Sequence, residues 1–221
     1  MNAKQRIASR VALEMKDGDV VNLGIGLPTM VTNYLPEDVR VMLQSENGFV
    51  GLCAASGEAQ PNIVNAGGQP AGLVPGAAMF DSAMSFALIR GGHVDVTVLG
   101  GLQVDCAGNL ANWMVPGKMV PGMGGAMDLV SGAKNVIVAM EHCAKDGGSK
   151  ILPECTLPLT GKGVVNLIVT EMAVFKVTAN GLVLEEHASG VSVDDIAGCT
   201  AASFSVSPYL KEMATDKEGA A

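Results

Sequence analysis

The sequence predicts an open α/β sheet, mostly parallel, with helices on both faces. Short apolar segments typical of buried strands alternate with amphipathic segments typical of helices almost throughout the chain. Apolar residues make up 48% of the 221 residues and aromatic residues only 4%, which indicates a core of aliphatic side chains. The length fits one domain, expected over residues 1–210, and the polar residues 211–221 are expected to form a disordered tail.

The first half of the chain contains three predicted helices and three predicted strands, with a glycine-rich region between them. Apolar residues at Ile7 and Val11 predict the first helix, and Pro28 and Asp81 are typical first residues of the other two. In chain order we predict a helix over 3–16, a strand over 19–26, a helix over 28–34, a strand over 39–46, short strands and ordered loops over 49–80, a helix over 81–92 and a strand over 93–101.

The second half begins with a predicted Asn/Gly hairpin near residues 102–112 and ends with a predicted helix. The pair Gly124-Gly125 precedes a helix pattern, and Ser192 is a typical residue to begin the last helix. Between these lie a predicted strand over 134–140, a helix-like segment over 163–170, and two strands over 173–177 and 182–187 joined by the turn TANG.

Composition excludes several classes of function. A formal charge of −8 and no cluster of Lys or Arg disfavour nucleic-acid binding. Apolar runs such as NVIVAM are far shorter than the roughly 18 residues of a membrane span. The charged, amphipathic start shows no export signal, and the five scattered cysteines favour a reducing compartment, so we expect a cytoplasmic protein. Neither cysteines nor histidines are spaced as metal ligands, so no metal site is expected.

Three motifs could carry chemistry, and each has a structural alternative. The Gly24-Ile25-Gly26 turn lacks the third glycine of a dinucleotide loop, which favours a simple tight turn that lines a pocket. Gly124 and Gly125 could expose N–H groups to an oxyanion or could only allow close helix packing. Arg90 is interpreted as a helix-end cation rather than a phosphate contact.

Glu46 is the most informative residue. A glutamate at a strand end usually faces solvent. Glu46, however, follows an apolar strand at the edge where open α/β sheets bind ligands, and Ser45 and Asn47 flank it with polar groups. A carboxylate in that place can act as a nucleophile or a base.

Together these motifs resemble the B-type half of the 3-oxoacid family of CoA-transferases, the acetate/acetoacetate and succinyl-CoA type. The resemblance runs from about residue 3 to residue 208 and includes QSENG (44–48), GIGLPT (24–29), VNAGG (64–68) and NLANWMVPGKMVPGMGGAMDLV (109–130). It implies the CoA-transferase type of fold that is shared with the NagB and RpiA proteins.

The resemblance also implies a mechanism. In this family the glutamate that corresponds to Glu46 attacks an acyl-CoA and then carries CoA as a glutamyl thioester, and Gly125 supplies a backbone N–H to the oxyanion. Substrate or CoA binding is implied less firmly for Gly24, Gly26, Asn47, Gly48 and Gly124. No permanently bound cofactor is expected, because CoA is a substrate.

The resemblance finally implies partners and leaves alternatives open. An A-type subunit is expected in an A2B2 or A4B4 hetero-oligomer, with acyl-CoA and a carboxylic acid as substrates and with acetate, acetoacetate or butyrate favoured. An acyl-CoA hydrolase on the same framework would instead release free CoA to water. If the chain were a non-catalytic binding protein, the complex would keep full activity after Glu46 is replaced.

Overall fold

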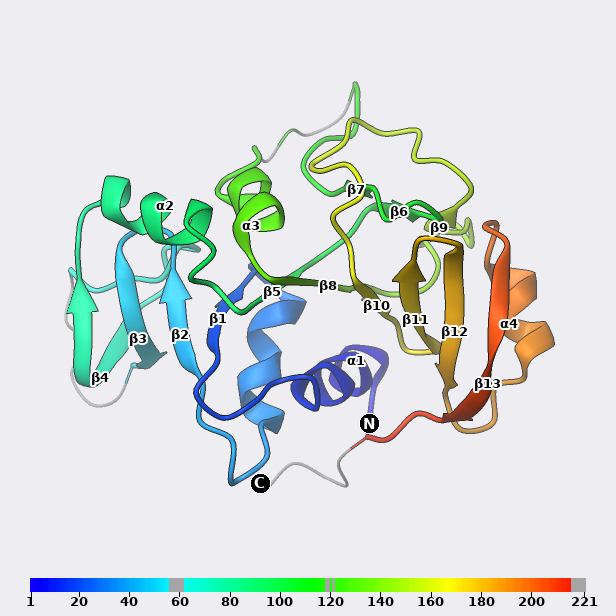
Figure 1. The fold of residues 1–221 in the computed structure, drawn as a ribbon, viewed down its shortest axis with the longest axis horizontal. Coiled ribbons are helices and arrows are strands. Elements are labelled where there is room, and N and C mark those ends of the chain that lie inside the picture. Colours follow the sequence, from blue (N-terminus) through cyan, green and yellow to red (C-terminus); the bar gives the residue numbers. More distant parts are fainter. Residues whose placement is uncertain (56–61, 118–119, 121, 216–221) are drawn as a thin grey trace.

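The computed structural model describes residues 1–55, 62–117, 120 and 122–215. Within these residues ten strands form one sheet, in the order β13-β12-β11-β10-β8-β5-β1-β2-β3-β4 (Figure 1). Its five central strands run parallel, which confirms the predicted fold class. They are β2 (Met42–Ser45), β1 (Val20–Leu23), β5 (Val96–Leu99), β8 (Asn135–Ala139) and β10 (Leu167–Val169).

Antiparallel pairs extend this parallel centre at both ends. On one side β11 (Ala173–Thr178) and β12 (Gly181–His187) pair antiparallel, and β13 (Phe204–Glu212) adds parallel to β12. On the other side lie β3 (Phe49–Ala54) and β4 (Ala71–Met79). A small second sheet contains β7 (Leu110–Ala111), β6 (Gln103–Asp105) and β9 (Ile151–Leu152), and β6 and β7 form the predicted Asn/Gly hairpin.

Helices cover both faces of the large sheet, because alternate residues of its buried strands point to opposite sides. In β8, Val136 and Val138 join one apolar cluster, and Ile137 joins the other. The first cluster is covered by α2 (Ser82–Arg90), α3 (Ala126–Gly132) and α4 (Val193–Cys199), and the second by α1 (Ala3–Ala12) and the 3-10 helix η1 (Leu27–Tyr34). Figure 1 shows α2 and α3 on one side of the sheet and α1 on the other.

The predicted helix starts are confirmed where a side chain caps them. Asp81 accepts a hydrogen bond from the N–H of Met84, and Ser192 forms a capping box with Asp195. Such caps act within one turn of helix, so local sequence is enough to predict them.

The second half of the chain differs from the predictions in one segment that was assigned wrongly and in one strand that was not predicted. The helix-like segment 163–170 is wrong, because it contains the buried strand β10, and a short apolar run fits either state. The strand β13 was not predicted. Of the expected tail, Lys211 and Glu212 belong to β13, and the N–H of Met213 donates to the carbonyl of His187 at 2.7 Å. Residues 216–221 lie outside the described residues.

Candidate active site

The carboxyl edge of the parallel strands holds a cavity of about 580 Å³. Asn22 and Gly24 come from the end of β1, and Glu46 follows β2. Gly100 follows β5, and Gly125 precedes α3. Segments far apart in the sequence meet here because parallel strands end at the same edge, which is the usual place for a ligand in an open α/β sheet.

Glu46 is the first residue of a three-residue turn between β2 and β3. Ser45 pairs with Phe49 across the two strands, and the N–H of Gly48 donates to the carbonyl of Ser45 at 3.0 Å. Gly48 has a φ of 117°, and a Cβ there would overlap the carbonyl oxygen of Phe80. Only glycine fits this position, so the tight turn fixes where Glu46 leaves the strand.

Ser45 and Asn47 hold the turn against the segment that follows β3. The Ser45 hydroxyl donates to Asn47 Oδ1 at 2.6 Å and accepts from the N–H of Ala66 at 3.2 Å. The Asn47 amide donates to the carbonyl of Val64 at 2.8 Å. The polar residues that flank Glu46 are therefore engaged in fixing the backbone on both sides of it.

Gly125 lies directly against the Glu46 side chain. A Cβ at Gly125 would stand 3.1 Å from Cγ and 3.5 Å from Cδ of Glu46. The predicted nucleophile and the predicted oxyanion donor are thus neighbours in space, although they lie far apart in the sequence.

The glycine-rich segment before α3 leaves backbone N–H groups without acceptors. Gly122 and Gly124 have φ values of 90° and 52°, which glycine adopts without strain, and Gly125 caps α3 without a side-chain hydrogen bond. Within the described residues, the N–H groups of Gly124 and Gly125 have no hydrogen-bond acceptor. Free N–H groups at a helix start suit an anionic oxygen.

Asn22 is a cavity residue that the sequence analysis missed. Its side chain is 1% exposed, and its Nδ2 donates to Glu46 Oε2 at 3.3 Å. The available signal was an amide between the apolar residues Val21 and Leu23 of a buried strand. Across the described residues, this is the one hydrogen bond of the half-buried Glu46 carboxylate, and no cation pairs with it.

The other predicted site residues divide into two groups. Gly24 and Gly124 line the cavity. Gly26, Asn47 and Gly48 do not line it, and they lie in the turns that shape its surroundings.

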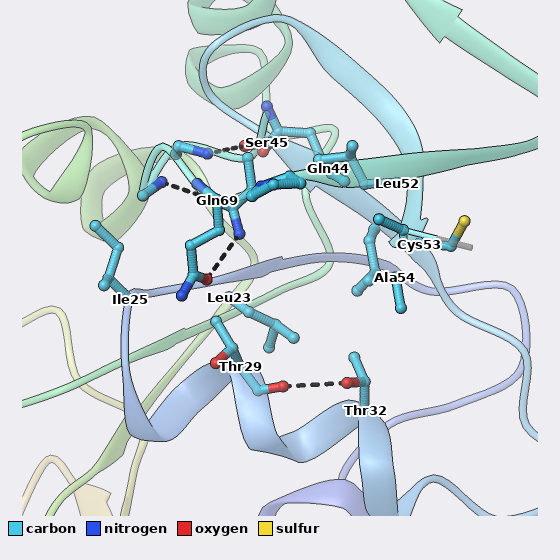
Figure 2. A pocket seen from close by; sticks show the side chains of 17 residues that line it. Leu23, Ile25, Thr29, Thr32, Gln44, Ser45, Leu52, Cys53, Ala54 and Gln69 are labelled. Atoms are coloured by element: carbon cyan, nitrogen blue, oxygen red, sulfur yellow. Dashed lines mark hydrogen bonds between the residues drawn. The ribbon is translucent and has the colours of Figure 1, made fainter. Parts of the chain in front are cut away.

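A second pocket, of about 470 Å³, lies beside the same strand (Figure 2). Figure 2 shows Ser45 on one wall, Leu52 and Cys53 of β3 on another, and Thr29 and Thr32 of η1 opposite. Ser45 lines this pocket together with Leu43 and Gln44 of β2, whereas Glu46 lines the cavity, and Leu23, Ile25 and Ala66 line both.

Other candidate chemistry lies outside this cavity. Arg90 ends α2, forms an ion pair with Asp128 at 2.6 Å and lies over the ring of Phe86, which confirms its helix-end interpretation. No group of three or more metal-ligating side chains occurs within residues 1–55, 62–117, 120 and 122–215. Over the same ranges, no helix combines the length and apolarity that a membrane crossing requires.

The fold and the site define the class: an α/β enzyme that holds a carboxylate and a glycine-rich helix start at the carboxyl edge of its sheet. The family model for coenzyme A transferases matches residues 4–198. The chain belongs to this family and is a CoA-transferase subunit of the B type.

Two relatives and one solved structure support the assignment. The chain is 63% identical to the beta subunit of the acetate CoA-transferase of Haemophilus influenzae over 220 residues, 99% of each chain. It is 54% identical to the mitochondrial succinyl-CoA:3-ketoacid coenzyme A transferase 2B of Mus musculus, covering 96% of this chain and 41% of the mouse protein. An acyl-CoA transferase from Escherichia coli O157:H7, solved as a thioester complex with CoA, superposes with a TM-score of 0.77 at 26% identity, covering 97% of this chain and 43% of the other.

Proposed function

We propose that Glu46 is the nucleophile that carries CoA between a short-chain acyl-CoA and a free carboxylic acid. The observation that carries this proposal is the close approach of Gly125 to Glu46, which brings a carboxylate and an unused backbone N–H together in one cavity. The thioester complex of the Escherichia coli relative with CoA supports the same type of intermediate here.

The reaction proceeds in two balanced halves. A Glu46 oxygen attacks the thioester carbonyl carbon, the C–S bond breaks, and an acyl-glutamyl anhydride and CoA thiolate result. The thiolate then attacks Cδ of Glu46, and the bond between Cδ and the bridging oxygen breaks, which releases the acyl group with that oxygen as the first carboxylate and leaves a glutamyl-CoA thioester. A second carboxylate reverses these steps.

The surroundings of Glu46 suit this role. A carboxylate is ionised near neutral pH, so it needs no neighbouring base to become a nucleophile. The Asn22 amide, at 3.3 Å, orients the carboxylate without neutralising it, and among the described residues no Lys, Arg or His pairs with it. Closure of the cavity around acyl-CoA would remove water from a nucleophile that is only half-buried in this chain.

Gly125 is assigned the oxyanion N–H. Each attack creates a negative oxygen on a tetrahedral carbon beside Glu46, and a fixed N–H at a helix start stabilises that oxygen. Gly24 and Gly124 are assigned to the cavity wall, where a substrate passes close to backbone. Gly26, Asn47 and Gly48 are assigned to positioning these segments.

Substrates and partners are proposed from the relatives. The names of the bacterial relatives favour acetate as one exchanged acid, and acetoacetate and butyrate are proposed beside it. Their designation as beta subunits, together with the larger size of the mouse relative, supports an A-type partner, and an A2B2 or A4B4 assembly is part of the proposal. We place the enzyme in the cytoplasm, since all five cysteines are free thiols. No permanently bound cofactor is proposed.

The test is to trap the intermediate in the complex with the A-type subunit. The complex is incubated with acetoacetyl-CoA and digested with trypsin, which yields the peptide 41–90. Mass spectrometry should find CoA on Glu46 and not on Glu58, the other glutamate of this peptide. The adduct should disappear when acetate is added.

The matched variant is Glu46→Gln, which keeps the shape of the side chain and removes its charge. Loss of turnover by at least about 10³-fold is expected, as for other covalent nucleophiles. If a folded, CoA-binding complex formed no adduct on Glu46, the nucleophile assignment would be wrong. Steady release of free CoA without an acceptor acid would instead support the hydrolase, and full activity of Glu46→Gln would support a non-catalytic binding protein.

A further inference from the structure

Three buried polar side chains form a connected chain behind Glu46. Asn22, Gln44 and Ser85 are 1%, 4% and 0% exposed, and they come from β1, β2 and α2. Asn22 and Gln44 are register partners on the parallel strands β1 and β2. We call these three residues the buried relay.

The hydrogen bonds of the relay run in one direction. The Ser85 hydroxyl donates to the carbonyl of Ser45 at 3.3 Å and accepts from Gln44 Nε2 at 3.0 Å. Gln44 Oε1 accepts from Asn22 Nδ2 at 2.7 Å, and the same nitrogen lies 3.2 Å from the carbonyl oxygen of Gln44 and 3.3 Å from Glu46 Oε2, so its two hydrogens serve three acceptors. The chain therefore begins at the backbone just before Glu46 and ends at its carboxylate.

Donor and acceptor roles in this chain are fixed by chemistry. A hydroxyl has one hydrogen, and the hydrogen of Ser85 is used on a carbonyl that can only accept. Ser85 must then accept from the Gln44 NH2 group, which leaves Gln44 Oε1 to face Asn22. If the Asn22 amide were rotated by 180°, its oxygen would face Gln44 Oε1, the carbonyl oxygen of Gln44 and Glu46 Oε2, and these acceptors would repel one another.

The buried relay lowers folding stability, because it contains a buried polar atom without a partner. Buried polar side chains are unfavourable unless they are hydrogen-bonded, and Asn22 Oδ1 is buried without a partner in the described part of the chain. The amide keeps this orientation although its oxygen is unpaired. What the orientation supplies is an NH2 group that faces Gln44 Oε1, the carbonyl oxygen of Gln44 and Glu46 Oε2.

We propose that Gln44 and Ser85 are positioning residues for Glu46. They act through Asn22, whose oriented N–H holds Oε2 so that the carboxylate stays against Gly125 with its other oxygen free to attack. In the glutamyl thioester the one remaining Glu46 oxygen is the carbonyl oxygen. With this oxygen at the Oε2 position, the same N–H would donate to it as negative charge develops during attack on Cδ. This inference rests on the proposed role of Glu46 as nucleophile.

The test measures adduct formation on Glu46 in the complex with the A-type subunit, using single turnover with acetoacetyl-CoA. Gln44→Met keeps the length of the side chain and removes both hydrogen bonds, and Ser85→Ala removes the hydroxyl. Each variant should form the adduct about 10 to 100 times more slowly, as expected for a misplaced reacting group, with KM for acyl-CoA nearly unchanged. Ser85→Thr, which restores a hydroxyl, should recover part of the rate.

A double-mutant cycle separates positioning from general destabilisation. If Gln44 acts through Asn22, then Gln44→Met should slow the reaction little further when Asn22→Ala is already present. Thr200→Val is the matched control, because it also replaces a buried hydroxyl, which bonds His142 and Ile196 at the end of α4. It should lower stability and leave the adduct rate unchanged.

The outcomes distinguish this inference from the proposed function. No adduct in the wild-type complex would overturn the role of Glu46 itself. An adduct that forms at the wild-type rate in Gln44→Met or in Ser85→Ala, or full additivity with Asn22→Ala, would overturn the relay alone. If Gln44→Met does not assemble with the A-type subunit, the milder Ser85→Ala decides.

Discussion

At the scale of single residues, the contact between Gly125 and Glu46 leaves no room for a side chain. Gly125→Ala keeps the backbone N–H but would bring a methyl group within 3.1 Å of Glu46 Cγ, so the carboxylate must move. We predict a rate of adduct formation about 10²-fold lower, because displacement of a reacting group by about 1 Å has an effect of this size.

The rate is measured by rapid quenching of the complex. Gly198→Ala is the matched control, since Gly198 has an open environment in α4 and its replacement should leave the rate unchanged. A Gly125→Ala complex with the wild-type rate would show that Glu46 does not need its present position.

His142 is a second residue with a measurable consequence. It is fully buried between Thr170 and Thr200, and its ring nitrogens contact both hydroxyls at 2.9 Å. Burial, with a smaller contribution from the charge of Lys150, lowers the pKa of His142 to about 4. An imidazole in the unfolded chain has a pKa near 6.5, so the unfolded state binds more protons between these values.

Folding stability should therefore fall as the pH falls from about 6.5 towards 4. We predict a loss of about 2 kcal/mol from His142 between pH 7 and pH 5, measured by urea unfolding. The variant His142→Gln should lose this part of the pH dependence. A His142 pKa near 6.5 in the folded protein, measured by NMR, would contradict the prediction.

At the scale of elements, a buried ion pair ties α1 to β12. Arg10 donates to both oxygens of Glu186, at 2.6 and 3.0 Å, and both side chains are buried. The guanidinium of Arg10 and the ammonium of Lys211 hold the pKa of Glu186 below its usual value, although burial opposes this. The end of β13 thus contributes a charge to the same site.

Removal of one partner should be more harmful than removal of both. Arg10→Met leaves Glu186 buried without its main partner, and we predict a loss of about 3–5 kcal/mol in the free energy of unfolding. The double variant Arg10→Met, Glu186→Leu should recover much of this loss. Equal destabilisation by the single and double variants, measured by chemical denaturation, would contradict this account.

Elements also show how far sequence patterns can be used. Asp81 and Ser192 predicted two helix starts because a cap depends on neighbouring residues only. The segment 163–170 was wrongly predicted as helix-like. It contains the strand β10 because β10 pairs with β8, and local periodicity carries no information about such pairing. The strand β13 has mostly exposed side chains and a proline, so it lacks an apolar pattern.

The site was predictable to a similar extent. Glu46 and Gly125 were predicted as site residues from the family resemblance of their motifs, but their closeness in space arises from the order of strands in the sheet. Asn22, Gln44 and Ser85 were not identified. Each is a single polar residue in an apolar segment, and their hydrogen bonds join three elements that only the fold brings together.

At the scale of the whole molecule, the cavity of this chain is open to solvent at its apolar rim. Ile25 and Met123 line the cavity and are 73% and 43% exposed. Such side chains are typical of surfaces that another chain covers. We predict that the purified chain alone gives no turnover with acetoacetyl-CoA and acetate, and that addition of the A-type subunit restores it.

Size-exclusion chromatography of the same mixtures should show one larger species when activity appears. Ile25→Asp should weaken that association, whereas Tyr209→Asp, at an 84% exposed residue of β13 on the far end of the sheet, serves as the control. Full turnover by the chain alone would show that its cavity is complete without a partner.

The pocket beside the cavity has a pharmacological consequence. The 470 Å³ pocket adjoins the cavity, with which it shares Leu23, Ile25 and Ala66, and the hydroxyl of Ser45 bonds the turn that carries Glu46. A small molecule that filled the pocket and displaced Ser45 would displace the turn that carries Glu46. Such an inhibitor would act through Ser45 rather than by binding Glu46, and by linkage acyl-CoA and the inhibitor would change each other's affinity by the same factor.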